Sequence, residues 1–470
     1  MRNKMIDTLE QALKACQIEN GMTLSFHHHL RNGDYVLNKT LDAAARLGLR
    51  DLKISASSLF PVHAPMVGHA REGVFTRLDA GVMSGSLGKA MLEAPLAEPV
   101  IMRTHGGRAR AIDTGELPID VAVIAAPAVD RFGNISGVAG PSAFGSIGYA
   151  IPDSQHARTV IAVTDHCVDG LLEQVSISHD LVDYIVPLDH IGDPKGIETG
   201  TTKLTKDPVA LRIARLACQL IEHSGLLRDG INFQTGAGGA SLATAHFMRE
   251  IMRARGIKGG FLLGGTTTYL VSMLEEGLFA DMFDVQCFDL TAVRSLGSNP
   301  RHREISASLY ASPGRKSCYV DALDVVLLGA TEIDTAFNVN VHTDSSGIII
   351  GGSGGHSDTA AGAKLAVIVA PLVRGRLPIV VDKVITCTTP GNTVDALVTE
   401  YGIAINPANA GLRDSLHGSG LPILDIDELR AIALSLAGEP DPVQWSDRVF
   451  AKVEYRDGTF IDEILIPASG

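Results

Sequence analysis

The chain has 470 residues, more than one hydrophobic core usually spans, so two or three domains are expected. Hydrophobic residues make up 45% of it and charged residues 20%, which is typical of a well-packed soluble protein, and no stretch reaches the roughly 20 apolar residues that a membrane helix needs. The net charge of −13 disfavours a nucleic-acid partner.

The N-terminal segment MRNKMIDTLEQALKACQ contains acidic residues and no continuous apolar run, so it does not match a secretory signal and we expect a cytoplasmic protein. Three histidines follow at 27–29, where an apolar run ends. Because side chains alternate along a strand, at most two of them share a face, and we expect no metal site. The sequence contains no HExxH motif, Walker A loop or CxxC pair, so the chemistries of those motifs have no basis in it.

Apolar runs of strand length alternate with helix-length segments along the chain. The runs DVAVIAAPAV (120–129) and DVVLLGATEI (324–333) predict strands buried on both faces, as in parallel sheets. Between them, DPVALRIARLACQLIEHSG (207–225) predicts a helix with Asp207 as its N-cap and Pro208 in its first turn. This alternation indicates an α/β protein with mostly parallel sheets.

The chain also repeats itself. IDVAVIAAPAVDRFGN from Ile119 aligns without gaps with LDVVLLGATEIDTAFN from Leu323, and each is a strand followed by an acidic–Asn turn. Two further pairs recur in the same order: ENGMTLSFHHHL with RDGINFQTGAGG, and VIAVTDHC with IVVDKVITC. A repeat of this length predicts two similar domains, 1–225 and 226–470, with the natural site in the cleft between them.

Three glycine-rich segments follow predicted strands: QTGAGGAS (234–241), LLGGTTTY (262–269) and GGSGGHSD (351–358). Their main-chain N–H groups could bind an anion, and His356 and Asp358 could orient a ligand or donate to a developing negative charge. The structural alternative is that the glycines serve tight turns, that the threonines form an ST-turn or N-cap, and that His356 is solvated. In either case we expect Asp358 to cap the helix that follows.

RTHGGRARAI (103–112) places three arginines around His105, and guanidinium groups suit two-point contact with carboxylates or phosphates. RHREIS (301–306) and VRGRLP (373–378) are further basic segments in an acidic chain. Each could hold a carboxylate or dock an acidic partner, and each could equally be a solvated surface loop.

Taken together, these segments resemble the alpha-subunit family of citrate lyase. The resemblance covers almost the whole chain and rests on RTHGGRARAI, DRFGNISGVAGPSAFGSIGYA, FQTGAGGASLA, DVQCFD, EIDTAFNVNVHTDSSGIIIGGSGGHSDTAAGAKL and TTPGNTVDALVTEYGIAINP. It implies two CoA-transferase-like, ribose-5-phosphate-isomerase-related α/β domains in tandem. It also implies a transferase reaction, in which citrate and the acetyl thioester on the phosphopantetheine arm of an acyl carrier protein give a citryl thioester and acetate.

The same resemblance implies the partners. They are the acyl carrier protein (the gamma subunit), a beta subunit that cleaves the citryl thioester, and further copies of this chain within a multi-subunit complex. No cofactor is expected to be bound by this chain, and acetyl-CoA could substitute for the natural thioester. A local basic patch such as Arg374 and Arg376 would meet the acidic carrier protein.

The resemblance also suggests roles for the candidate residues. We predict that backbone amides stabilise the oxyanion of the reaction and that arginines hold citrate. The predicted catalytic residues are Gly354, Gly355, His356 and Asp358. Those predicted to bind the thioester arm are Gly236, Ala237, Gly238, Gly239, Gly264, Gly265 and Thr266. Those predicted to bind citrate are Arg108, His105, Arg294, His302 and Arg303.

Many CoA-transferases of related fold use a glutamate nucleophile, whereas the corresponding strand here ends in GGTTTY without a carboxylate. Glu275 and Glu276 lie later, on a predicted helix, and Glu332 ends a strand. We therefore predict direct attack of a citrate carboxylate through a mixed citric–acetic anhydride. Two alternatives stay open: a free-CoA transferase or thioester hydrolase with a glutamyl intermediate, and a non-catalytic ligand-sensing module on the same fold. The absence of an evident helix-turn-helix segment in the sequence speaks against the sensing module.

Overall fold

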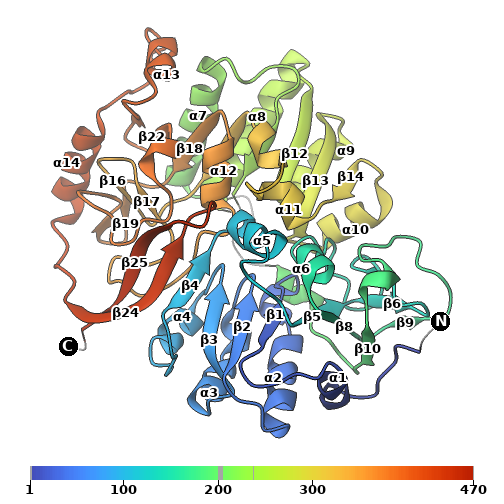
Figure 1. The fold of residues 1–470 in the computed structure, drawn as a ribbon. Helices are drawn as coiled ribbons and strands as arrows, with labels where there is room; N and C mark the ends of the chain where they lie inside the picture. Colours follow the sequence, from blue (N-terminus) through green and yellow to red (C-terminus); the bar gives the residue numbers. More distant parts are fainter. Residues whose placement is uncertain (1–2, 199–204, 237, 469–470) are drawn as a thin grey trace.

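Two large sheets, one for each half of the chain, organise the computed structural model, which describes residues 3–198, 205–236 and 238–468 (Figure 1). In spatial order the first sheet contains β10 (Tyr184–Pro187), β8 (Thr159–Thr164), β5 (Val121–Ala126), β1 (Thr23–Phe26), β2 (Leu52–Ala56), β3 (Phe75–Ala80), β4 (Val100–Arg103), β24 (Trp445–Glu454) and β25 (Phe460–Pro467). Its pairs are parallel except for the β24–β25 hairpin.

The second sheet has a matching order in the C-terminal half. It contains β14 (His302–Glu304), β13 (Phe279–Cys287), β12 (Gly259–Thr266), β11 (Phe233–Thr235), β15 (Val325–Leu328), β18 (Leu365–Val369), β22 (Ala396–Val398) and β23 (Ile403–Ile405). Its pairs are parallel except β22–β23. The predicted α/β class with mostly parallel sheets is therefore confirmed.

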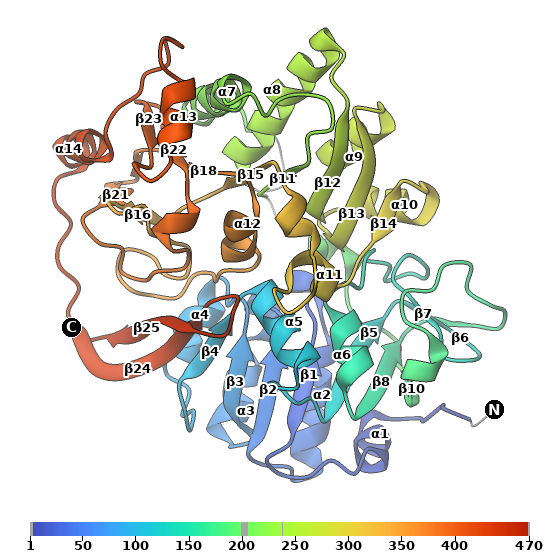
Figure 2. The same ribbon diagram turned by 45° about the horizontal axis from the view of Figure 1, so that its top comes forward.

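Helices cover both sheets. They are α1 (Leu9–Ala15), α2 (Val36–Arg46), α3 (Met66–Arg71), α4 (Ser86–Met91), α5 (His105–Asp113), α6 (Ala150–His156), α7 (Pro208–His223), α8 (Gly239–Arg255), α9 (Thr268–Glu275), α10 (Leu290–Ser298), α11 (Ala307–Ala311), α12 (His356–Gly362), α13 (Ala410–Ser415) and α14 (Ile426–Ala437). Helix α7 has the predicted start, because the Asp207 side chain accepts hydrogen bonds from the N–H groups of Val209 and Ala210. Helices α5, α6, α11 and α12 pack on one another between the two sheets (Figure 2).

The internal repeat is visible as a repeated topology. Strand β5 lies between β1 and β8, as β15 lies between β11 and β18. A small sheet follows each: β6 (Ala128–Asp130) with β7 (Ile135–Ser136) and β9 (Cys167–Val168), and β16 (Glu332–Asp334) with β17 (Val339–Asn340) and β21 (Val380–Val381). The two acidic–Asn turns are alike, because Asp130 accepts hydrogen bonds from both nitrogens of Asn134, and Asp334 does so from Asn338.

Two sequence expectations need correction. Each long predicted strand is two strands, interrupted at Pro127 in the first half and at residues 329–331 in the second. The pairing of VIAVTDHC with IVVDKVITC is wrong, because β18 (365–369) takes the place of β8, and segment 379–387 contributes only the short β21, the counterpart of β9. Apolar β-branched runs resemble one another too closely for sequence alone to choose the partner.

The C-terminal hairpin returns to the first half of the chain. Strand β24 pairs in parallel with β4, so residues 445–467, which we predicted to lie in the C-terminal domain, extend the N-terminal sheet (Figure 1). Buried apolar side chains of both halves, from Leu9 to Ile464, form one continuous cluster. The two halves are therefore packed as one body around their junction. None of the helices in the described residues combines the length and apolar character needed to cross a membrane.

Candidate active site

The glycine segment 351–355 lies where the two halves meet. The carbonyl oxygen of Gly354 accepts a 2.8 Å hydrogen bond from the N–H of His105, the first residue of α5 in the N-terminal half. The carbonyl of Gly351 accepts from the N–H of Met83, which follows β3, at 3.0 Å. Backbone hydrogen bonds therefore cross the junction between the two halves.

This close approach explains why the segment is rich in glycine. A Cβ atom at position 352 would lie 2.3 Å from the Gly81 carbonyl oxygen, and one at position 355 would lie 2.5 Å from the Tyr310 hydroxyl. Gly354 also has a φ of +53°, in the left-handed region that side chains disfavour. The glycines are therefore needed for the close contact between the halves and not only for the geometry of a turn.

The segment also presents unpaired donors. Within the described chain, the backbone N–H groups of residues 352–355 donate to no protein acceptor, whereas the next one, that of His356, donates to the Ser353 carbonyl at 2.8 Å. The glycines at 352, 354 and 355 are half-buried, so the main chain there is accessible from one side. A run of free amides in a half-buried setting is suited to binding a negatively charged oxygen.

The other glycine segments of the C-terminal half adjoin this one. A Cβ atom at Gly264 would lie 2.8 Å from the Gln234 side-chain amide, whose Nε2 donates to the Tyr310 hydroxyl at 2.9 Å. Because that hydroxyl also faces Gly355, one buried Gln–Tyr pair connects the two segments. Gly264 and Gly265 are the last glycines of β12 and flank a bulge, so they belong to the strand and not to a loop.

The other residues predicted to bind the thioester arm lie at the start of α8 or make hydrogen bonds within the protein. Gly236 donates its N–H to the Leu327 carbonyl at 2.9 Å, and Gly238 is the N-cap before Gly239 at the start of α8. The Thr266 hydroxyl donates to the buried carboxylate of Asp284. The predicted residue Ala237 lies outside the described residues.

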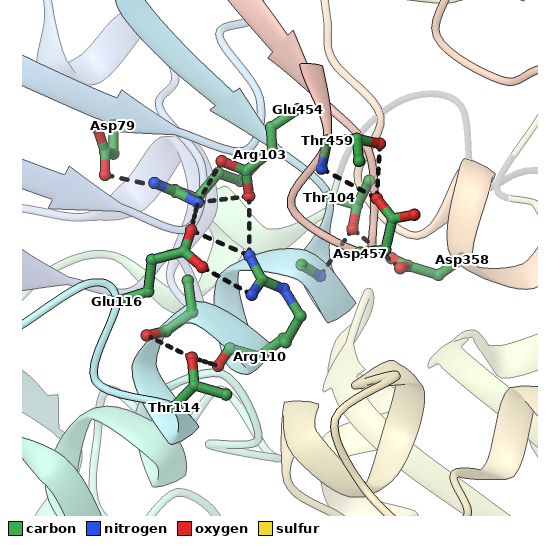
Figure 3. Close-up of polar contacts among 12 residues, drawn as sticks. Asp79, Arg103, Thr104, Arg110, Thr114, Glu116, Asp358, Glu454, Asp457 and Thr459 are labelled. Atoms are coloured by element: carbon green, nitrogen blue, oxygen red, sulfur yellow. Dashed lines mark hydrogen bonds and ion pairs between the residues drawn. The ribbon is translucent and has the colours of Figure 1, made fainter. Parts of the chain in front are cut away.

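Asp358 has a different role from the predicted one. Helix α12 is capped by Gly355, and no side chain caps it. The Asp358 carboxylate instead accepts hydrogen bonds from the N–H of Gly106 and the hydroxyl of Thr104, both at 2.9 Å, at the start of α5 (Figure 3). Burial raises the pKa of Asp358 to about 6, and the guanidinium of Arg456 opposes this shift. Asp358 thus caps a helix of the other half.

His356 is buried, not solvated. Its Nε2 lies 2.8 Å from the Gly329 carbonyl oxygen, which can only accept, so Nε2 carries the proton. Burial lowers the pKa of His356 to about 4, so the ring is neutral and Nδ1 accepts from the Thr389 hydroxyl at 2.7 Å. Both nitrogens are engaged within the C-terminal half, which leaves His356 no free N–H to offer an oxyanion.

The three histidines at 27–29 form a neutral aromatic cluster with His105 and Tyr149. The His28 ring stacks on Tyr149 and His105, with ring centres 4.7 and 5.4 Å away. Burial lowers the pKa of His27 to about 4 and that of His105 to about 3, and it holds those of His28 and His29 well below their usual range. Within the described residues, no group of three His, Cys, Asp or Glu side chains is placed to hold a metal ion.

A cavity of about 760 Å³ lies in the N-terminal half. Its walls include Arg31, Phe60 and Ser84, from the segments that follow β1, β2 and β3, together with Asp193, Lys195, Gly196 and Glu198. In parallel sheets, ligands bind at the carboxyl ends of strands, and this cavity lies at that edge of the first sheet.

Comparison with known proteins places the chain in a family. The family model described as "Citrate lyase, alpha subunit (CitF)" matches residues 2–466. The citrate lyase alpha chain of Klebsiella pneumoniae is 47% identical over 463 residues, which are 98% of this chain and 91% of that protein. The chain belongs to the citrate lyase alpha-subunit family. The alpha chain of Escherichia coli K12 is 46% identical over 461 residues, 98% of this chain and 90% of the relative.

Solved structures agree with this family. A protein from Streptococcus mutans, described as an alpha subunit of citrate lyase and crystallised in complex with citrate, is 45% identical with a TM-score of 0.98, covering 100% of this chain and 92% of that one. The alpha subunit of a malonate decarboxylase from Acinetobacter baumannii is 16% identical, with a TM-score of 0.69 over 94% of this chain and 85% of that one. This second likeness shows a shared fold alone.

The structure separates the residues that we predicted to bind citrate. His105 lies against the glycine segment, as described above. Arg108 is buried and makes a two-point contact with Asp153, with distances of 2.9 and 2.6 Å. His302 is buried between Asp284 and Ser295. The other two are exposed: Arg294 bonds the Thr291 hydroxyl in its own helix, and Arg303 pairs with Asp281.

The carboxylates considered as nucleophiles are also accounted for. Glu275 is exposed at the end of α9, and Glu276 pairs with Arg249 and Arg253. Glu332 is buried in β16, where it accepts hydrogen bonds from Asn340 Nδ2 at 3.0 Å and Ile385 N at 3.2 Å. Each carboxylate is thus exposed or held by a partner of its own.

Sequence reasoning missed Arg31 and Phe288, which meet at the junction of the halves. Arg31 stands alone in LRNGD, without the basic neighbours that drew attention to 103–112. Phe288 is the next-to-last residue of the motif DVQCFD, which carried the family resemblance but suggested no role. The one available signal was that both residues lie in segments that follow a strand, Phe288 directly after β13 and Arg31 a few residues after β1.

Proposed function

We propose that the protein is a transferase that exchanges the acyl group of a thioester, converting an acetyl thioester and citrate into a citryl thioester and acetate. The observation that carries this proposal is the run of unpaired backbone amides at 352–355, held at the junction of the halves. Membership of the citrate lyase alpha-subunit family supports it, as does the citrate bound to the relative from Streptococcus mutans.

The chemistry needs orientation more than acid–base catalysis. A citrate carboxylate oxygen attacks the thioester carbonyl carbon, and the carbonyl oxygen gains the negative charge of a tetrahedral intermediate. Amides that donate to this oxygen stabilise it, and each such donor is typically worth about 10²–10³ in kcat. The neutral rings of His105 and His356 fit this scheme, because it requires no proton exchange with either ring.

Two displacements complete the exchange. The first intermediate collapses by expelling the thiolate, which leaves a mixed citric–acetic anhydride. The thiolate then attacks the citryl carbonyl carbon of the anhydride and expels acetate. No carboxylate of the chain takes part in this route, in keeping with the positions of Glu275, Glu276 and Glu332.

We further propose that the natural thioester is carried on the phosphopantetheine arm of an acyl carrier protein and that a beta subunit cleaves the citryl product. The exposed side chains Arg374 and Arg376, in and beside the small hairpin of β19 (Val373–Arg374) and β20 (Leu377–Pro378), offer positive charge to an acidic carrier.

An exchange assay with the isolated chain tests the reaction. Acetyl-CoA and citrate are mixed with the protein, with no other subunit present, and products are followed by mass spectrometry. We expect citryl-CoA and acetate in equal amounts. Transfer to simple acids such as propionate but not to citrate, or hydrolysis of acetyl-CoA alone, would instead support the free-CoA enzyme.

Trapping tests the route. The protein is incubated with acetyl-CoA, treated with hydroxylamine or borohydride, and mapped by peptide mass spectrometry. Unmodified glutamates agree with direct attack, provided that the same preparation is active in the exchange assay. A glutamyl hydroxamate or a reduced glutamate side chain would overturn the direct mechanism.

A further inference from the structure

The guanidinium group of Arg31 has no counter-ion among the described residues. In the part of the chain that the structure describes, its side chain makes no hydrogen bond or ion pair, and its Nε is buried and unpartnered. Arg31 is half-buried. The fully buried arginines nearby are paired: Arg103 contacts Glu454, and Arg108 contacts Asp153. A cation that is partly removed from water gains from a compensating anion, so the missing partner points to a ligand.

Two aromatic rings hold this guanidinium. Its Cζ lies 5.1 Å from the ring centre of Phe60, in the N-terminal half, and 4.7 Å from that of Phe288, which follows β13 in the C-terminal half. Ring faces attract the flat cation and leave the N–H groups at its edge free to donate. Burial lowers the pKa of Arg31 to about 10, so the group is still charged at neutral pH.

The backbone at Arg31 is strained in a way that fits a functional position. Its φ of +52° lies in the left-handed region, which a side chain other than glycine rarely adopts. The turn is fixed by the Arg31 N–H, which donates to the His28 carbonyl at 2.8 Å, and the Gln286 side chain from the other half donates to the same oxygen at 3.2 Å. Such strain persists where the surrounding structure enforces it, often at binding sites.

Arg31 lines the cavity of about 760 Å³ described above, within the range that small-molecule sites occupy. Lys195 adds a second positive charge to its wall. The acidic side chains that also line it, Asp193 and Glu198, are exposed, and Asp193 already accepts from the Lys195 N–H at 2.9 Å. The positive charge held inside the cavity is therefore that of Arg31.

Residues next to the cavity contact both glycine segments that the reaction would use. The Phe288 ring lies directly against Gly265, where a Cβ atom would approach it to 2.2 Å. On the other side, Ser84 lines the cavity, and its neighbour Met83 donates to the Gly351 carbonyl. Phe288 and Met83 thus connect the surroundings of Arg31 to Gly265 and Gly351.

We propose that Arg31, held by the rings of Phe60 and Phe288, binds a carboxylate of the acceptor acid in this cavity. The inference rests on the proposed transferase function and names the residue that recognises citrate. Two N–H groups at the edge of a guanidinium match the two oxygens of a carboxylate. Because citrate has three carboxylates, one can be bound by Arg31 while another attacks the thioester.

Substitution tests the proposal in the full-length protein. Arg31→Gln removes the charge and Arg31→Lys keeps it without the planar fork, while Arg71→Gln, an exposed residue paired with Glu93, is the matched control. Calorimetry should show citrate binding weakened by about 10- to 100-fold in Arg31→Gln and by less in Arg31→Lys. In the exchange assay, the KM for citrate should rise while that for acetyl-CoA stays within about twofold.

Three outcomes would overturn the proposal. The first is an unchanged citrate affinity in folded Arg31→Gln. The second is a rise in the KM for acetyl-CoA in place of that for citrate, which would assign Arg31 to a phosphate of the thioester arm. The third is an equal effect of Arg71→Gln on citrate binding. If instead the wild-type protein neither binds citrate nor exchanges it, the proposed function itself fails, and the two failures are distinct.

A chemical probe on the wild-type protein covers the case in which the Arg31 variants do not fold. Phenylglyoxal modifies accessible guanidinium groups, and peptide mass spectrometry reports the rate at each arginine. Citrate should slow modification of Arg31, while propionate should not, and the rate at Arg71 should be unaffected by either. Equal rates at Arg31 with and without saturating citrate would contradict the proposal.

Discussion

The Asp358 carboxylate joins the two halves of the molecule by accepting from the Gly106 N–H at 2.9 Å and from the Thr104 hydroxyl at the same distance. It follows the glycine segment by three residues, and the next contact along the junction is that between the His105 N–H and Gly354. The Asp358 side chain, together with the backbone contacts of Gly351 and Gly354, therefore sets the position of the free amides relative to the N-terminal half.

Removing this carboxylate should loosen the junction. Asp358→Ala leaves a buried N–H and a buried hydroxyl without their acceptor, and we expect a loss of about 1–3 kcal/mol in the free energy of unfolding, with reduced kcat. Asp358→Asn should lose less than half as much, because the amide oxygen can accept from Gly106 while its NH₂ faces Thr104. Urea unfolding and the exchange assay measure both effects.

The control for this prediction is Asp382→Ala, which removes an exposed carboxylate paired with Arg430. Exposed pairs of this kind contribute about 0–1 kcal/mol. If Asp358→Ala is no more destabilising than Asp382→Ala, the contact across the junction does not hold the halves together.

Arg108 offers a test of the citrate assignment made from the sequence. Its guanidinium is already occupied by Asp153, and both side chains are buried. We expect Arg108→Ala to lower the free energy of unfolding by about 3–5 kcal/mol, because it leaves a buried carboxylate without its partner. The double variant Arg108→Met with Asp153→Leu should recover part of this loss, as measured by urea unfolding. A variant of unchanged stability with weakened citrate binding would restore the predicted role.

The sequence predicted those features that depend on local hydrogen bonds. The turns at Asp130–Asn134 and Asp334–Asn338 were predicted from spacing, because an Asx turn is built by residues two to four apart. The N-cap of α7 was predicted for the same reason. A short-range pattern determines its own geometry, so the residue types suffice.

Contacts between distant parts of the chain were not predictable in this way. Nothing near residue 450 indicates that β24 would pair with β4, nor does segment 103–112 show that its arginines face Glu454, Glu116 and Asp153. The sequence does not distinguish an arginine that binds a substrate from one that pairs with a buried carboxylate. Only the fold separates them, which is why Arg31 was missed and Arg108 was chosen.

Glu454 connects the C-terminal hairpin to the first half. It contacts Arg103, which also lies 3.4 Å from Asp79, and it lies 3.5 Å from Arg110 (Figure 3). We expect Glu454→Ala to lower the free energy of unfolding by about 2–3 kcal/mol. This is less than for a buried pair that is broken completely, because Arg103 retains its contact with Asp79.

Limited proteolysis is the second measurement for this prediction, since a released hairpin exposes residues 445–467 to cleavage. The matched control is Glu463→Ala in the same hairpin, whose carboxylate is half exposed and lies 3.9 Å from Lys452. Equal stability and equal cleavage rates of the two variants would show that Glu454 does not anchor the hairpin.

Mild acid should destabilise the protein through its buried histidines. Burial holds the pKa of His27 and His356 at about 4 and that of His105 and His342 at about 3, whereas an unfolded chain binds these protons near pH 6.5. The unfolded state therefore takes up more protons below pH 6.5, and stability falls as the pH drops. Asp358 acts in the opposite direction, because its pKa is raised to about 6 in the folded state, but it is a single carboxyl set against several histidines.

The melting temperature should accordingly decrease from pH 7.5 to pH 5.5, because the buried histidines together outweigh Asp358. His342→Asn should reduce the fall, because asparagine keeps an acceptor for the Thr388 hydroxyl, now 2.7 Å from Nδ1, and does not titrate. Replacing the exposed His417 by Gln is the control and should leave the pH profile unchanged. A melting temperature that is constant or rises toward pH 5.5 would mean that the buried rings are not what makes the fold sensitive to acid.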